Sequence, residues 1–172
     1  LVEGNHYRTI WPNKDLSGVT IIDQTFLPFE FKLLQLGTLN EIVEAIKSMR
    51  VRGAPLIGVT AAYGIAIALT EGLSDESLIA AKKVLIESRP TAVNLSWAVN
   101  LVYDQLKKEP KVNRASIAWD LANRLADEDV KINQSIGSFG LKLIQKIKKP
   151  RINILTHCNA GWLATIDYGT AL

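Results

Sequence analysis

The chain has 172 residues, of which 48% are hydrophobic, and a formal net charge of +3. This length supports one sizeable hydrophobic core, or one domain together with part of another. A single cysteine excludes an intrachain disulfide, and the first six residues have neither a basic region nor an apolar run, so we expect a cytoplasmic protein without a secretory signal.

Neither the charge nor the apolar stretches indicate a nucleic-acid or membrane partner. The densest basic stretch, residues 142–151, lacks interleaved aromatic side chains and reads as a helix C-terminus, where cations suit the helix dipole. The longest weakly charged stretch, residues 54–70, contains Pro55 and Tyr63 and is shorter than a typical membrane span. We therefore expect no nucleic-acid binding and a buried core helix.

The first part of the chain predicts small antiparallel strands. Apolar and β-branched residues alternate with polar ones over residues 7–11, 18–23 and 29–36, with Pro12 and Pro28 in the breaks between them. This alternation is typical of strands with one buried face.

From Thr38 onward the pattern predicts a helical bundle. Thr38 and Glu41 have the spacing of a capping box, and the helix that follows carries an apolar stripe. The stripe consists of Ile42, Val43, Ile46 and Met49. Further helices are expected over residues 54–69, 75–86, 94–107 and 113–147, the last with possible kinks at Gly137 and Gly140.

The end of the chain returns to an α/β pattern. Residues 151–156 predict one buried strand of the parallel type, and residues 162–165 predict the start of another helix. One such strand cannot form a sheet alone. We therefore predict an α/β fold class, with an α+β domain of antiparallel strands and a helical bundle over residues 1–149 and the beginning of a Rossmann-like domain over residues 150–172.

Two helix junctions carry residues suited to phosphate. In Arg50-Val51-Arg52-Gly53-Ala54-Pro55, a glycine at a helix start would let an anion approach free backbone amides, and an arginine fork fits phosphate oxygens. Arg89, before Pro90, would be a second clamp if the junctions meet in space. The alternative is structural: Gly53 serves a turn, Arg89 sits at a helix C-terminus, and Asn94 caps the next helix.

The third candidate is Cys158, which follows the predicted strand in a polar loop. A thiol at the carboxyl edge of a parallel sheet, beside a helix N-terminus, can become reactive, whereas a lone cysteine is otherwise a small buried hydrophobe. The only histidines, His6 and His157, lie too far apart in sequence to give metal-ligand spacing, so we expect no metal. Asp167 has no local feature that distinguishes it from a helix-surface carboxylate.

Four motifs, taken together and in this order, resemble those of the methylthioribose-1-phosphate isomerase family. They are Ile22-Asp23-Gln24-Thr25, the stretch from Met49 to Pro55 with Ala61-Ala62-Tyr63-Gly64, Arg89-Pro90-Thr91-Ala92-Val93-Asn94-Leu95, and Thr156-His157-Cys158-Asn159-Ala160-Gly161 with Tyr168-Gly169-Thr170-Ala171. This family is related to the regulatory α, β and δ subunits of translation initiation factor 2B. The resemblance runs through nearly the whole chain.

The resemblance implies a dimeric, cofactor-independent isomerase of methionine salvage, with a C-terminal Rossmann-like domain of which this chain holds only the beginning. Arg52, Gly53, Ala54 and Arg89 match substrate-binding positions of the family, and Cys158 matches its catalytic cysteine. The family's catalytic aspartate has no counterpart here, and Asp167 does not replace it. We therefore expect the 172-residue chain to be nearly inactive alone.

Two other functions stay open from the sequence. Relatives in the family accept other aldose 1-phosphates, such as 5-deoxyribose 1-phosphate or ribose 1,5-bisphosphate. The motifs do not indicate which group the substrate of this chain carries at C5. A non-catalytic regulatory subunit, like those of the initiation factor, would use the same fold to bind partner proteins. The presence of Cys158 together with Arg52, Gly53 and Ala54 argues against that second class.

Overall fold

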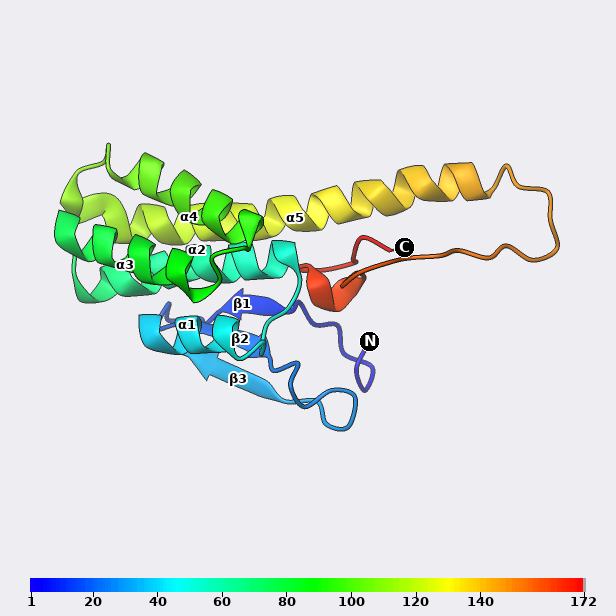
Figure 1. Cartoon of the computed structure of the whole chain (residues 1–172), viewed down its shortest axis with the longest axis horizontal. Coiled ribbons are helices and arrows are strands. Elements are labelled where there is room, and N and C mark those ends of the chain that lie inside the picture. Colours follow the sequence, from blue (N-terminus) through cyan, green and yellow to red (C-terminus); the bar gives the residue numbers. More distant parts are fainter. Residues whose placement is uncertain (172) are drawn as a thin grey trace.

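A computed structural model describes residues 1–171 of the chain and places a small sheet beneath a helical bundle (Figure 1). In chain order the elements are β1 (Ile10–Pro12), β2 (Val19–Ile22), β3 (Leu33–Leu36), α1 (Leu39–Lys47), α2 (Ala54–Glu71), α3 (Asp75–Ser88), α4 (Val93–Leu106), η1 (Lys111–Asn113), α5 (Arg114–Ile144) and η2 (Trp162–Ala164). The predicted combination of antiparallel strands and a helical bundle is confirmed. The predicted second domain ends at Leu172, which lies outside the described residues.

The sheet has three antiparallel strands in the order β1-β2-β3. Ile10 pairs with Ile21, and Val19 pairs with Leu36, so the apolar residues of neighbouring strands share one face. All four residues of the central strand β2 are buried. The three strands are shorter than predicted: β1 has three residues, and β2 and β3 have four each.

Helix α2 forms the centre of the bundle and packs against α1, α3, α4 and α5. Its length and composition would suit a membrane span, but 78% of it is buried inside the fold, as the core-helix prediction requires. Gly64 allows this packing, because an added Cβ would lie 2.9 Å from Cγ2 of Ile42 on α1 and 3.1 Å from Cδ2 of Leu85 on α3.

Helix α1 begins with the predicted capping box. The Thr38 hydroxyl accepts the Glu41 N–H at 3.3 Å, and the Glu41 carboxylate accepts the Thr38 N–H at 3.0 Å. Ile42, Val43 and Ile46 are buried, as the stripe predicts. Met49 is not: it lies beyond the helix end with φ 59° and is 46% exposed, because the helical period that would carry it into the core stops at Lys47.

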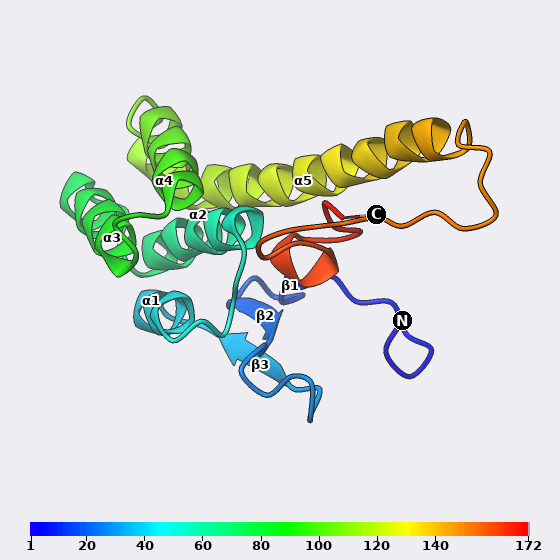
Figure 2. The same cartoon turned by 45° about the vertical axis from the view of Figure 1, so that its right-hand side comes forward.

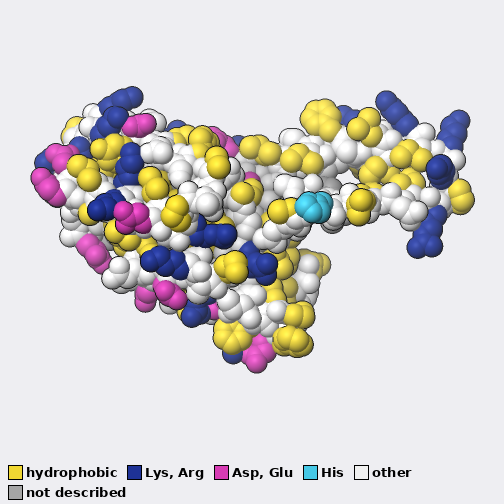
Figure 3. All heavy atoms as spheres, in the orientation of Figure 1, with side chains coloured by type: hydrophobic (Ala, Val, Ile, Leu, Met, Phe, Trp, Pro, Cys, Tyr) yellow, Lys and Arg dark blue, Asp and Glu magenta, His cyan; other side chains and the backbone are white. Residues whose placement is uncertain are grey.

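One boundary prediction for the later helices is wrong. Asn94 does not cap α4, which already begins at Val93 with Ala92 at the cap and no side-chain cap bond. Helix α5 is continuous through Gly137 and Gly140, and a Cβ added at Gly140 would meet nothing within 4 Å. The end of α5 projects from the body (Figure 2) and exposes apolar side chains (Figure 3), among them Phe139, Leu141 and Leu143.

The strand predicted over residues 151–156 is absent from the structure, and these residues are exposed coil. A parallel strand needs neighbouring strands for its backbone hydrogen bonds, and the three described strands form a separate antiparallel sheet. The helix predicted from Trp162 is only the 3₁₀ turn η2, which ends at Ala164. The start of a Rossmann-like domain is therefore not formed within the described residues.

Asp23, at the end of β2, is a buried carboxylate that joins this sheet to the segment before α2. It accepts the Thr25 N–H at 3.0 Å, the Thr25 hydroxyl at 2.6 Å and the Arg50 guanidinium at 2.5 Å. Burial alone raises its pKa, but the hydrogen bonds from Thr25 and Arg50 outweigh this effect and hold the pKa of Asp23 below its ordinary value. The charged form is thus favoured in the folded chain.

We expect Asp23→Asn to weaken the dependence of stability on acid pH. A lowered folded-state pKa stabilises the fold above the unfolded-state pKa of about 3.9, and this contribution is lost as the pH falls through the folded-state value. We therefore expect the free energy of unfolding, measured with urea, to fall less between pH 7 and pH 3 in the variant than in the unaltered chain. Asp120→Asn, on the exposed side of α5, is the control, and equal losses in all three proteins would contradict the expectation.

Candidate functional site

The N-terminus of α2 presents backbone amides without a side-chain cap. Gly53 occupies the cap position with φ 93° and ψ 141°, a conformation that favours glycine, and Pro55 follows in the first turn. Arg52 and Ala54 are exposed, and the Arg52 guanidinium has no ion-pair or hydrogen-bond partner within residues 1–171. These features suit an anion that binds the helix terminus.

Gly53 also brings α2 against the segment that follows Cys158. A Cβ added at Gly53 would lie 2.5 Å from Cα and 2.6 Å from Cβ of Ala164, in η2. Because Gly53 has no side chain, the start of α2 packs directly against η2. The structure shows that the missing side chain at Gly53 makes room for Ala164, while the contact of the backbone amides with an anion stays a prediction.

Cys158 lies in the exposed coil that precedes this contact, with φ 68°. It is neither buried nor at the end of a strand, so its predicted place at the edge of a parallel sheet is not formed within the described residues. The loop then turns at Gly161, with φ 87°, into η2, where it meets Gly53. Exposure leaves the thiol open to a ligand.

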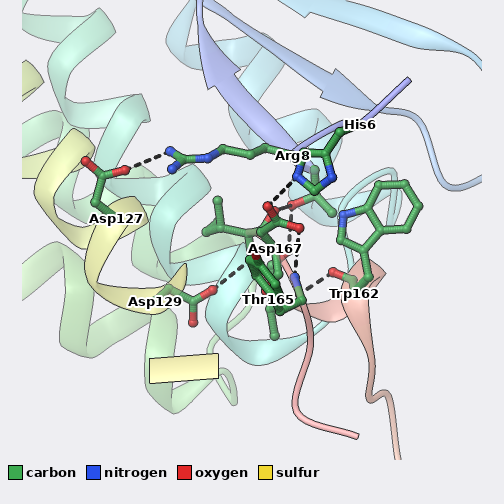
Figure 4. Close-up of polar contacts among 10 residues, drawn as sticks. His6, Arg8, Asp127, Asp129, Trp162, Thr165 and Asp167 are labelled. Atoms are coloured by element: carbon green, nitrogen blue, oxygen red, sulfur yellow. Dashed lines mark hydrogen bonds and ion pairs between the residues drawn. The ribbon is translucent and has the colours of Figure 1, made fainter. Parts of the chain in front are cut away.

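The N-terminal segment and α5 hold the residues that follow η2 in place (Figure 4). Thr9 donates its N–H to the Ile166 carbonyl at 3.0 Å and its hydroxyl to the Thr165 carbonyl at 2.5 Å. His6 Nε2 lies 2.6 Å from Oδ2 of Asp167, and the Ile166 N–H donates to Oδ2 of Asp129 on α5 at 2.8 Å. Asp167 is thus a buried, paired carboxylate and no helix-surface group.

No local pattern could have found these contacts. His6 and Asp167 are separated by 161 positions, and neither residue has a motif of its own. Gln24 belongs to the first of the four family-like motifs. Its side-chain amide donates to the Leu163 carbonyl at 2.7 Å, and its backbone N–H donates to the Arg50 carbonyl at 2.9 Å. Gln24 therefore links the segment before α2 to η2.

The junction that carries Arg89 lies at the same end of the bundle as the start of α2. Pro55 of α2 lines one groove together with Val93 and Asn94 of α4, which follow Arg89 closely in the chain. Arg89 is half-buried, and its side chain has no ion-pair or hydrogen-bond partner among the described residues. The start of α4 thus lies beside the start of α2. Among the described residues no hydrogen bond or ion pair joins Arg89 to Arg52 or to Cys158, so a joint role of the two arginines stays a prediction.

Asp129, which lines this groove, is a titratable group with a shifted pKa. Burial raises its pKa, and the hydrogen bond from the Ile166 N–H opposes that effect without cancelling it. Its carboxyl group lines the groove and at the same time anchors the segment after Cys158. No three His, Cys, Asp or Glu side chains within residues 1–171 are arranged to hold a metal ion.

Comparisons with known proteins match the chain along nearly its full length. It is 53% identical to a protein named methylthioribose-1-phosphate isomerase from Sinorhizobium medicae, over 99% of this chain and 48% of the relative. A crystal structure of 5-methylthioribose 1-phosphate isomerase from Pyrococcus horikoshii OT3 is 37% identical with a TM-score of 0.82, over 96% of this chain and 47% of that one. The chain spans about half the length of the curated relatives it matches.

A second solved structure links the fold to translation initiation. The delta subunit of the initiation factor eIF-2B from A. fulgidus is 35% identical with a TM-score of 0.80, over 94% of this chain and 48% of that one. The model of the initiation factor 2 subunit family matches residues 50–167, a range that contains Arg52, Gly53, Ala54, Arg89 and Cys158. By this match, the chain belongs to the initiation factor 2 subunit family.

Proposed function

We propose that this chain supplies the N-terminal half of the site of an aldose–ketose isomerase, which converts 5-methylthioribose 1-phosphate to 5-methylthioribulose 1-phosphate in methionine salvage. The observation that carries the proposal is the contact of Gly53 with Ala164, since it joins the anion-binding start of α2 to the segment that follows Cys158. Relatives about half identical to the chain bear the name of this isomerase.

The residues fit the needs of this reaction. A phosphate on the anomeric oxygen blocks spontaneous ring opening, so the ring oxygen must receive a proton before hydrogen moves from C2 to C1. In this proposal Arg52, Arg89 and the amides of Gly53 and Ala54 hold the phosphate and orient the reacting carbons. Cys158 acts at those carbons, as a proton carrier or as a stabiliser of the transition state.

The remaining expectations belong to the same proposal. We infer a first domain over residues 1–149 and a Rossmann-like domain that begins at residue 150, with a homodimer in the cytoplasm and no cofactor, metal, nucleic acid or membrane. The 172-residue chain alone should be nearly inactive, because the family's catalytic aspartate has no counterpart in it. Loss of a general acid or base typically lowers a rate by about 10²–10⁴-fold.

The test is turnover of 5-methylthioribose 1-phosphate by the protein as its gene encodes it, followed by the NMR signals of the ketose. Formation of the ketose supports the proposal. The alternative is a regulatory subunit that binds a sugar phosphate or a nucleotide without converting it, and the likeness to the eIF-2B delta subunit favours it. Binding of the sugar phosphate without any turnover would support that alternative and overturn the isomerase.

Removal of either phosphate-holding arginine should weaken substrate binding. We expect Arg52→Ala and Arg89→Ala to raise KM by about tenfold or more each, because a charge-assisted hydrogen bond contributes roughly 1.5–3 kcal/mol. Steady-state kinetics measure the effect. Arg124→Ala, an exposed arginine of α5 outside the groove, is the control, and an unchanged KM in both site variants would refute the assignment.

A further inference from the structure

A groove of about 480 Å³ runs between α2, α4 and α5 and begins where the proposed phosphate site ends. Pro55, the residue after Ala54, lines its near end, and Asp129 joins its wall to the segment that follows Cys158 through the Ile166 N–H. Its volume suits a small molecule of the size of a substituted pentose. The groove therefore lies next to the proposed phosphate site along α2, and the bond from Ile166 to Asp129 ties its wall to the segment after Cys158.

The lining of the groove is mostly apolar. Val59 comes from α2, Trp97 from α4, and Leu125 and Ile132 from α5. Gly58 forms the floor, since an added Cβ would lie 3.0 Å from the Asn94 carbonyl oxygen, and its absence lets α2 and α4 approach closely. Trp97 is 55% exposed and Ile132 is 59% exposed, so both leave apolar surface free at the rim.

The charged groups of the lining determine which end of a sugar phosphate fits. They are Glu128 and Asp129, both acidic, and no lysine or arginine of the described chain lines the groove. Carboxylates at these positions repel a phosphate, whereas Arg52 and Arg89 at the helix junctions attract one. A ligand with one charged and one apolar end would therefore place its apolar end in the groove.

We propose that the groove binds the alkylthio group at C5 of the substrate, with Trp97 and Ile132 as specificity-determining contacts. This assignment rests on the proposed function. The thioether sulfur packs favourably against aromatic rings, and Trp97 offers an exposed ring at the groove. A substrate with a hydroxyl or a phosphate at C5 lacks the apolar contacts with Trp97 and Ile132. A phosphate at C5 is also repelled by the carboxylate of Glu128.

The experiment compares kcat/KM for 5-methylthioribose 1-phosphate and for ribose 1-phosphate in the protein as its gene encodes it. We expect Trp97→Ala and Ile132→Ala to lower kcat/KM for the methylthio substrate about tenfold, with ribose 1-phosphate changed by less than about twofold. Ile136→Ala is the matched control, because it is the same substitution one turn further along α5, 42% exposed and outside the groove.

The outcomes separate the two proposals. If the unaltered protein converts the methylthio substrate but both variants keep its preference over ribose 1-phosphate, the groove assignment is overturned and the isomerase stands. If the unaltered protein converts neither sugar phosphate, the proposed function fails and the groove assignment fails with it. Since Trp97 and Ile132 are both exposed, thermal unfolding of the variants should remain close to that of the Ile136→Ala control.

Discussion

Cys158→Ser should lower kcat by about 10²–10⁴-fold and leave KM for the sugar phosphate nearly unchanged. Serine keeps the approximate shape of the side chain but removes the thiol, the group to which the proposal assigns the proton transfer or the stabilisation of the transition state. The phosphate contacts that we propose for Arg52 and Arg89 lie elsewhere on the chain and should remain in the variant.

Because Cys158 is exposed, an effect of its substitution on activity can be separated from an effect on stability. The side chain is not part of the hydrophobic core, so the substitution should leave the melting temperature unchanged, and any loss of rate is then chemical. A second substitution in the same loop, Asn159→Ala, controls for changes in loop conformation. A Cys158→Ser protein with kcat within about twofold of the unaltered value would exclude a proton-transfer role for the thiol.

Gly53→Ala should reduce both activity and stability. Alanine at φ 93° is strained by roughly 1–3 kcal/mol, and its Cβ would overlap Ala164, so α2 and η2 must move apart. Misplacement of catalytic groups by about 1 Å can lower a rate about 10²-fold. We therefore expect kcat/KM to fall by about that factor, together with a lower melting temperature.

Gly4 offers a matched control for this substitution. It also has a positive φ, 81°, but an added Cβ there would meet nothing within 4 Å. Gly4→Ala thus reproduces the backbone strain without the overlap. If Gly53→Ala and Gly4→Ala lose the same stability and neither loses activity, the contact between Gly53 and Ala164 does not organise the site.

Local signals in the sequence predicted the helices well. The capping box of Thr38 and Glu41 forms as predicted, and Ser74 caps α3 through the Ser77 N–H at 3.1 Å. These signals act within a few residues and need no tertiary partner. The end of α3 at Ser88 likewise follows from Pro90, because the residue before a proline avoids the helical region.

Predictions that depend on distant partners were less successful. The apolar run over residues 151–156 has strand composition, but it lies exposed as coil because the three described strands lie elsewhere and leave it without a partner. For the candidate site, the sequence identified the start of α2, Arg89 and Cys158 as separate motifs. It could not predict that Gly53 packs on Ala164, or that His6 and Thr9 hold residues 165–167, since both depend on tertiary packing.

In the proposed site, the start of α2, the Arg89 junction and the Cys158 loop bind one sugar phosphate. The most direct test is a titration of the ¹⁵N-labelled protein, as its gene encodes it, with 5-methylthioribose 1-phosphate, read as changes in backbone amide shifts. We expect the largest shift changes at Gly53, Ala54 and Arg89 and in residues 158–161. These changes should saturate at one bound sugar phosphate per chain. Saturable shifts confined to other parts of the chain, or no saturable shifts at all, would contradict the account.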